Sequence, residues 1–159
     1  MIFKRLDSIV NAIIENLSNT LLFLMFFVVM LEVISRYVMK TPFFWTDELA
    51  RYLMFYMVMF GSSIALREER HPALLFIIEK FPKKIKNLWF IIVDIIISIL
   101  LIIIFKEGLS MAIDALNMKT PALRIPFFWV YLALPIGSLL MLYQIATKYI
   151  YRFMGERNK

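Results

Sequence analysis

The sequence predicts an all-α integral membrane protein with four transmembrane helices, additional interfacial amphipathic helices and both termini in the cytoplasm. Of its 159 residues, 62% are hydrophobic, whereas a soluble domain is about half apolar. The apolar residues form blocks of roughly 20, the length that crosses a bilayer, separated by short charged or proline-containing stretches. A single membrane domain over residues 1–159 accounts for the chain and leaves no room for a soluble catalytic domain.

Residues 1–17 have the pattern of one amphipathic helix. Apolar side chains recur at helical spacing and polar side chains lie on the opposite face, which predicts a helix lying in the membrane interface. A signal peptide is the alternative interpretation. However, Asp7 and Glu15 interrupt any apolar core of such a peptide, and no small-residue cleavage site follows.

The first two spans are predicted at about 18–39 and 45–66. Pro42 disfavours helix at the residue before it, and so separates the two spans. Trp45 begins the second span, and a charged stretch that contains Arg67 and His71 ends it.

The second half of the chain contains two further spans, at about 87–107 and 125–147. Before them, residues 73–81 are apolar but too short to cross a bilayer, which predicts a short interfacial segment. The fourth span has no charged residue after Arg124 and before Lys148.

Basic residues predict the orientation. Twelve of the 18 lysines and arginines fall in the N-terminal segment, the loop after the second span and the C-terminal tail: Lys4, Arg5, Arg67, Arg70, Lys80, Lys83, Lys84, Lys86, Lys148, Arg152, Arg157 and Lys159. The other six fall on the opposite side: Arg36, Lys40, Arg51, Lys106, Lys119 and Arg124. The positive-inside rule then places both termini in the cytoplasm. The basic residues that give the net charge of +6 are interpreted as setting the orientation in the membrane and contacting lipid headgroups, not as binding a nucleic acid.

A charged, aromatic corner lies between the first two spans. Glu32 and Arg36 are four residues apart, as are Asp47 and Arg51, so each pair can form on one helical face. If the two helices are neighbours, Glu48 joins these charges in one cluster. A proton or ion relay is one interpretation. A satisfied network that fixes helix packing or docks a partner is favoured, because opposite charges are balanced within a turn.

Asp94 lies inside the third span and has no basic residue three or four positions away. It requires a partner from another helix, a subunit or water. A buried structural hydrogen-bonding group is favoured over an ion-coupling site, because one acid makes a poor sodium cage. His71 is the single histidine and is assigned to an interfacial loop. Cysteine is absent, which excludes disulfides, thiol catalysis and thiolate metal sites. No phosphate loop, HExxH motif or pair of catalytic acids occurs, so no catalytic, cofactor or metal site is predicted.

A short repeat links the two halves of the chain. Met-Lys-Thr-Pro followed by Phe-Phe-Trp occurs at 39–45 and, with an insertion, at 118–129. Pro126 and Trp129 thus form a second aromatic corner before the fourth span. A structural duplication is one interpretation, and chance in a biased composition is the other.

The combined pattern resembles the small membrane subunit (the DctQ-like Q subunit) of tripartite ATP-independent periplasmic (TRAP) transporters. The residues that carry the resemblance are Arg36-Tyr37, the run 45–52, Gly61-Ser62, Arg67, His71, Pro126, Trp129, Pro135 and Gly137. The resemblance assigns a set of residues to a partner interface or structural polar network: Glu32, Arg36, Tyr37, Trp45, Asp47, Glu48, Arg51, Arg67 and His71.

The resemblance implies a small scaffold subunit, not an enzyme, in the inner membrane of a bacterium. Such a subunit stabilises a large multi-span subunit that carries the sodium and substrate sites. An extracytoplasmic binding protein delivers an organic acid, of sialic acid or C4-dicarboxylate type. Two alternatives remain from the residues: a small membrane enzyme that uses Glu32, Arg36, Glu48 and Arg51, and a self-assembling channel lined by Asp94.

Overall fold

The computed structural model describes residues 2–67 and 83–153. In these ranges the chain forms α1 (Ile2–Tyr37), α2 (Phe44–Arg67), α4 (Lys83–Asp114), α5 (Phe127–Tyr131) and α6 (Ala133–Phe153). Four helical stretches are long and apolar enough to cross a membrane: Lys4–Tyr37, Phe44–Arg67, Leu88–Asp114 and Phe127–Arg152. The predicted all-α class with four spans is therefore confirmed. His71 and the predicted segment 73–81 lie outside the described residues.

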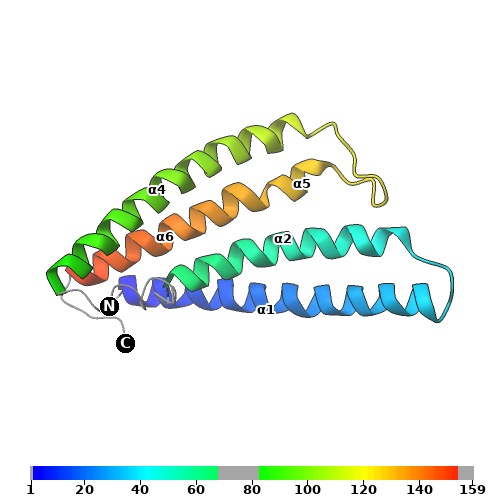
Figure 1. Cartoon of the computed structure of the whole chain (residues 1–159), viewed down its shortest axis with the longest axis horizontal. Coiled ribbons are helices and arrows are strands. Elements are labelled where there is room, and N and C mark those ends of the chain that lie inside the picture. Colours follow the sequence, from blue (N-terminus) through cyan, green and yellow to red (C-terminus); the bar gives the residue numbers. More distant parts are fainter. Residues whose placement is uncertain (1, 68–82, 154–159) are drawn as a thin grey trace.

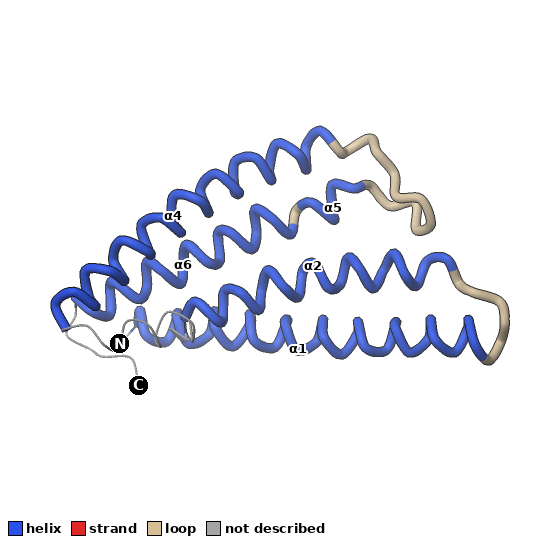
Figure 2. Tube along the Cα trace, in the orientation of Figure 1, coloured by secondary structure: helices blue, strands red, loops and turns tan. Residues whose placement is uncertain are grey.

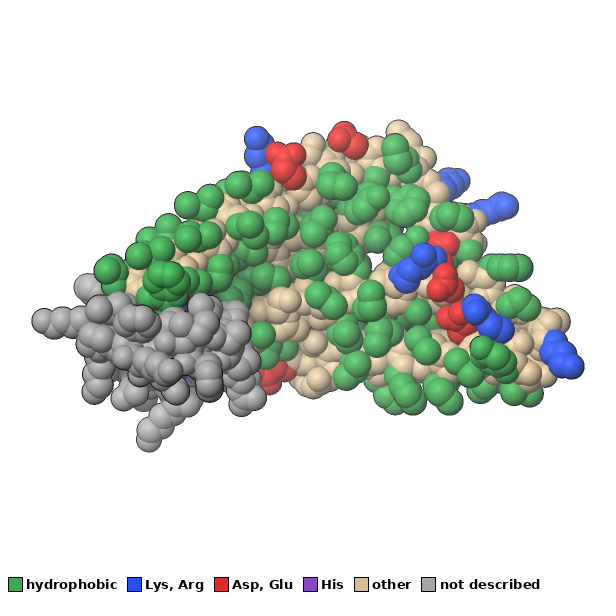
Figure 3. All heavy atoms as spheres, viewed as in Figure 1, with side chains coloured by type: hydrophobic (Ala, Val, Ile, Leu, Met, Phe, Trp, Pro, Cys, Tyr) green, Lys and Arg blue, Asp and Glu red, His purple; other side chains and the backbone are tan. Residues whose placement is uncertain are grey.

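The long helices lie side by side in a row, in the order α4, α6, α2 and α1, as Figures 1 and 2 show. A single layer has little interior. In the most apolar windows of α1, α2 and α4 only 6%, 11% and 11% of residues are buried. The corresponding value is 44% in the span that contains α6, which contacts α2, α4 and, at one end, α1. Apolar side chains consequently cover much of the face shown in Figure 3, as expected for a surface that contacts lipid or another protein.

Helix α1 is continuous for 36 residues, which corresponds to about 54 Å at 1.5 Å per residue. It passes without a break through residues 17–18, where the sequence predicts a boundary between an interfacial helix and the first span. Residues 2–17 are thus helical, but they extend the same helix instead of forming a separate one. Their location relative to the membrane stays a prediction.

The amphipathic start of α1 is oriented with its apolar face outward. Leu6, Ile9 and Ile13 are more than half exposed, at 56–59%, whereas Asp7 and Asn11 are buried. The sequence assigns these polar residues to the face that meets water. The reason for the difference is that α6 supplies hydrogen-bond partners to the polar face, while a lipid-facing surface requires apolar side chains.

The predicted fourth span is divided into α5 and α6 at Leu132. Pro135 explains the interruption, because proline lacks an N–H and its ring conflicts with the carbonyl four residues earlier. Just beyond, Gly137 approaches α2 so closely that a Cβ atom would lie 2.6 Å from the Cβ of Met59. Gly108 of α4 has the same role against α6, because its Cβ would lie 2.8 Å from that of Leu134.

Candidate functional site

The connections 38–43 and 115–126 lie at one end of the molecule, which we call the loop end (Figure 1). The start of α1, the end of α2, the start of α4 and the end of α6 lie at the other, which we call the terminal end. The residues selected from the sequence fall into these two groups.

Both ion pairs predicted from the spacing are present at the loop end. The Arg36 guanidinium lies 2.7 Å from the Glu32 carboxylate on α1. The Arg51 guanidinium lies 2.8 Å from the Asp47 carboxylate on α2. Each pair stays within one helix. Among the described residues, no ion pair joins α1 to α2 at this end of the molecule.

Glu48 has a different environment from these four residues. Its side chain is buried, and its carboxylate accepts hydrogen bonds from the Ala122 backbone N–H at 2.6 Å and the Tyr52 hydroxyl at 2.9 Å. Glu48 therefore holds the 115–126 connection against α2. Among the described residues, no hydrogen bond or ion pair is found between Glu48 and Glu32, Arg36 or Arg51.

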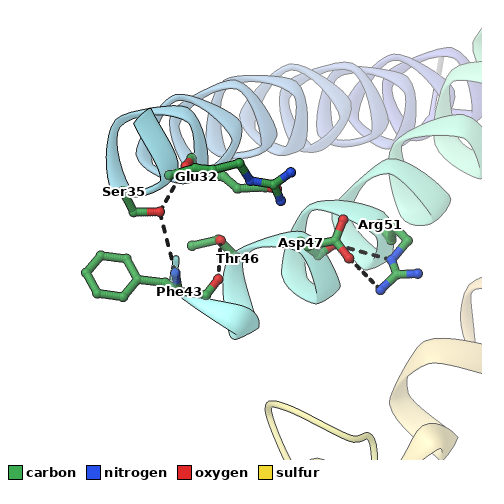
Figure 4. Close-up of polar contacts among 7 residues, drawn as sticks. Glu32, Ser35, Phe43, Thr46, Asp47 and Arg51 are labelled. Carbon is green, nitrogen blue, oxygen red and sulfur yellow. Dashed lines mark hydrogen bonds and ion pairs between the residues drawn. The ribbon is translucent and has the colours of Figure 1, made fainter. Parts of the chain in front are cut away.

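The turn between α1 and α2 is closed by uncharged groups (Figure 4). The Ser35 hydroxyl donates to the Glu32 carbonyl at 2.9 Å and accepts from the Phe43 N–H at 3.5 Å. Thr46 donates to the Phe43 carbonyl at 2.7 Å. Lys40 takes a left-handed conformation with φ of 54°. The turn is thus built from backbone and hydroxyl contacts, and the charged pairs lie beside it.

The aromatic residues of the two corners lie near the surface. Tyr37 is 74% exposed and Trp45 is 38% exposed, with the Trp45 ring stacked on Phe43. At the second corner, Pro126 precedes the first turn of α5. Trp129 is 58% exposed, and its carbonyl accepts a hydrogen bond from the Tyr56 hydroxyl of α2. The second corner is therefore attached to α2.

At the terminal end, Asp94 of α4 is paired with α6. Its carboxylate accepts from the Lys148 ammonium at 2.9 Å and from the Tyr149 hydroxyl at 2.8 Å. The side chains of Asp94 and Lys148 are only 9% and 11% exposed. The partner that the sequence required from elsewhere is thus a neighbouring helix. A signal for it was present, since Lys148 follows the fourth span at the same end as Asp94.

A second polar cluster at the terminal end was missed from the sequence. The Asp7 carboxylate of α1 accepts from Asn11 and from the hydroxyls of Tyr143 and Tyr151 of α6, all within 3.1 Å. Gln144 donates to the Asn11 side-chain oxygen at 2.6 Å. These contacts join α1 to α6. Gln144, a polar amide inside the predicted fourth span, was the local sign that the sequence offered, but it did not identify Asp7 and Asn11 as the partners.

Arg67 ends α2 and pairs with Glu15 of α1 at 3.1 Å. His71, which the sequence groups with Arg67, lies outside the described residues. In the ranges that the structure describes, no group of three acidic or histidine side chains could hold a metal ion. The buried acids Asp7 and Asp94 and the Arg67–Glu15 pair thus make contacts between helices.

Comparison with known proteins adds the family. The profile described as "Tripartite ATP-independent periplasmic transporters, DctQ component" matches residues 25–155. The sialic acid TRAP transporter small permease protein SiaQ of Vibrio cholerae is 26% identical over 148 residues, which are 93% of this chain and 86% of SiaQ.

Two other relatives are much longer than this chain. The sialic acid TRAP transporter permease protein SiaT of Haemophilus influenzae is 28% identical over 141 residues, which are 85% of this chain and 22% of SiaT. The isethionate TRAP transporter permease protein DctMQ of Oleidesulfovibrio alaskensis is 26% identical over 99 residues, which are 61% of this chain and 16% of DctMQ. The chain thus spans less than a quarter of the length of either relative.

Proposed function

The chain belongs to the DctQ component family of tripartite ATP-independent periplasmic transporters, and we propose that it is the small scaffold subunit of a sodium-coupled secondary transporter. In this role it stabilises a large multi-span membrane subunit that carries the transport sites. The similarity to a small permease protein over 86% of that protein's length supports the assignment to the small subunit.

The structural observation that carries the proposal is the closure of the polar sites by the chain itself. Asp94 is paired with Lys148, Glu48 holds the 115–126 connection, and the exposed pairs Glu32–Arg36 and Asp47–Arg51 each lie within a single helix. A substrate site needs polar groups that are available to a ligand. Here the two buried acids, Asp94 and Glu48, instead hold parts of the same chain together, which is what a scaffold requires. The enzyme and channel alternatives lose their main residues, Glu48 and Asp94, to these contacts.

The substrate that we propose for the complex is an organic acid. Two of the relatives have sialic acid in their names, and a third has isethionate. All are anions, and a sialic acid or a C4-dicarboxylate is the type proposed here. An extracytoplasmic binding protein delivers it to the membrane subunits.

The proposed location is the bacterial inner membrane, with both termini in the cytoplasm and the loop end outside. This orientation follows from the excess of basic residues predicted on the cytoplasmic side. The start of α1 and the end of α6 lie together at the terminal end, as two termini on one side of a membrane require. Lipids then contact the exposed apolar faces, and the loop end is accessible to the binding protein.

The proposal is tested by reconstituting uptake. The chain, its large permease subunit and its binding protein are co-expressed in a host that lacks organic-acid uptake, and uptake of labelled sialic acid and a C4-dicarboxylate is measured with and without sodium. Uptake should require all three proteins and sodium. Uptake that persists at full rate when this chain is omitted contradicts the scaffold role, and uptake by this chain alone contradicts the accessory role.

A further inference from the structure

Helix α2 has three faces along its length, and two of them are occupied within the chain. One face contacts the α5 and α6 side through Tyr52, whose ring lies 6.5 Å from that of Phe127, and Met59, which packs at Gly137. A second face contacts α1 through Arg67, which pairs with Glu15.

The third face of α2 is regular, and in the described structure it borders other helices only at its end, where Ala65 lines a groove with α4 and α6. Asp47, Arg51, Met54, Val58, Gly61 and Ala65 follow one another at spacings of four, three, four, three and four residues. We call this row the α2 seam. Such spacing is that of the contact positions in helices that pack nearly parallel. Met54 and Val58 are 49% and 46% exposed, so the seam is open to the surroundings.

The residue types in the α2 seam differ from those on faces suited to lipid. The outer face of α1 carries large apolar side chains, such as Phe23 at 69% and Phe26 at 62% exposure. The α2 seam instead begins with a charged pair and ends with glycine and alanine. The Asp47 and Arg51 side chains are 56% and 66% exposed within a candidate span (Figure 4). Small residues are typical of helix contacts in membranes.

Gly61, in the α2 seam, has a different environment from the other two glycines inside helices. A Cβ atom at Gly61 would meet nothing within 4 Å. At Gly108 and Gly137, by contrast, a Cβ atom would overlap a neighbouring helix of the same chain. Glycine inside a helix is less stable than alanine, so its presence normally reflects a close approach. No close approach to Gly61 occurs within the described chain.

An apolar groove borders the same part of α2. It has a volume of about 350 Å³ between α2, α4 and α6. Ala65 and Ser62 form one side, Leu100 and Ile104 of α4 form the other, and Met141 of α6 lies between them. A helix that lies on the α2 seam near Gly61 would find space for its larger side chains in this groove.

We propose that the α2 seam is the docking site for one transmembrane helix of the large permease subunit. The proposal rests on the proposed function and names the surface that serves it. The large subunit is favoured over a second copy of this chain because two relatives, SiaT and DctMQ, match this chain over less than a quarter of their own length. In those permease proteins, the matching region is covalently joined to a much larger one.

The first test replaces Gly61 with leucine in the complex co-expressed with the large permease subunit. Leucine has space within the isolated chain, so the variant should keep its melting temperature when purified alone. Co-purification with the large subunit should fall at least tenfold. Ala146→Leu is the matched control, because Ala146 is an exposed small residue on α6, away from the α2 seam, and it should co-purify as the wild type does. Unchanged co-purification of Gly61→Leu overturns the proposal.

The second test reports the occupant directly and does not depend on how Gly61→Leu folds. A photo-crosslinking amino acid is placed at Val58 of the α2 seam or, as a control, at Leu139 on the exposed face of α6. An adduct with the large subunit from Val58 but not from Leu139 supports the proposal. Adducts with a second copy of this chain, or with lipid alone, overturn it. If the wild-type chain fails to co-purify with the large subunit, the proposed function fails first.

Discussion

The terminal end and the loop end satisfy their acidic side chains in different ways. At the terminal end, Asp7 and Asp94 accept hydrogen bonds from residues of α6 that are more than 50 positions away in the sequence. At the loop end, Glu32 and Asp47 pair with arginines one turn away on the same helix. Glu48 is the exception, because it holds a distant connection.

This difference indicates which charges maintain the fold and which are available to a partner. Removing one partner of a buried polar pair lowers the stability of the protein, because the other group is left unpaired and out of contact with water. Exposed pairs within one helix contribute little to stability. The polar contacts at the terminal end therefore hold the row of helices together, and the two exposed pairs at the loop end are suited to contacts with another protein.

The largest effect is expected for Asp94→Ala. The change removes the carboxylate that accepts from both Lys148 and Tyr149 at a site less than a tenth exposed. Breaking a buried ion pair in this way should destabilise the chain by about 3 kcal/mol. Thermal unfolding in detergent measures the loss, with Asp47→Ala at the loop end as the matched control. Equal losses in the two variants would remove the distinction between the ends.

The conservative variant Asp94→Asn separates structure from ion coupling. The amide keeps an oxygen that can accept from Tyr149, so part of the stability should remain. We expect the sodium dependence of uptake by the complex to be unchanged. A shifted sodium dependence would assign Asp94 to an ion site and contradict its structural role.

Asp7→Ala should give the next largest effect. The variant loses three accepted hydrogen bonds, two of which join α1 to α6, at a side chain only 8% exposed. We expect a loss of about 2 kcal/mol, from the cost of leaving buried donors without a partner. Ser8→Ala, at the exposed neighbouring position, is the control and should melt as the wild type does. A stable Asp7→Ala chain would show that the start of α1 is not held by α6.

Asp7 and Asp94 also show how much of the structure could be predicted from the sequence. The four spans and the pairs Glu32–Arg36 and Asp47–Arg51 were predicted correctly, because helix length and four-residue spacing are local properties. The partners of Asp7 and Asp94 depend on which helices are neighbours. Spacing within one helix does not contain that information, and the only signal for Asp94 was the position of Lys148 at the same end of the fourth span.

The partner of the polar face of α1 was missed for a related reason. Apolar periodicity identifies a helix and its faces, but in a membrane it does not tell which face is buried. Only the position of Tyr143, Gln144 and Tyr151 on α6 makes the polar face of α1 the inner one. The division of the last span at Leu132 was also missed, although Pro135 was a sufficient signal for it.

Glu48→Ala should have an intermediate effect that is confined to the loop end. The variant loses the acceptor for the Ala122 N–H and the Tyr52 hydroxyl. A loss of about 1.5 kcal/mol is expected, together with faster hydrogen exchange in residues 115–126. Glu48→Gln keeps one acceptor oxygen, so its stability and its hydrogen exchange should lie between those of Glu48→Ala and the wild type. Unchanged exchange in this connection would show that Glu48 does not hold it.

Arg51→Ala should have the smallest effect on the chain and a clear effect on the complex. The Arg51 side chain is 66% exposed and its partner Asp47 is 56% exposed, so unfolding should change by no more than about 0.5 kcal/mol. In the complex, the same change leaves the Asp47 charge without its partner on a face proposed to meet the large subunit. Co-purification or uptake should then decrease while the melting temperature of the isolated chain stays constant. If both co-purification and uptake are unchanged, the exposed pair has no role in assembly, and the contrast between the two ends reduces to one of stability alone.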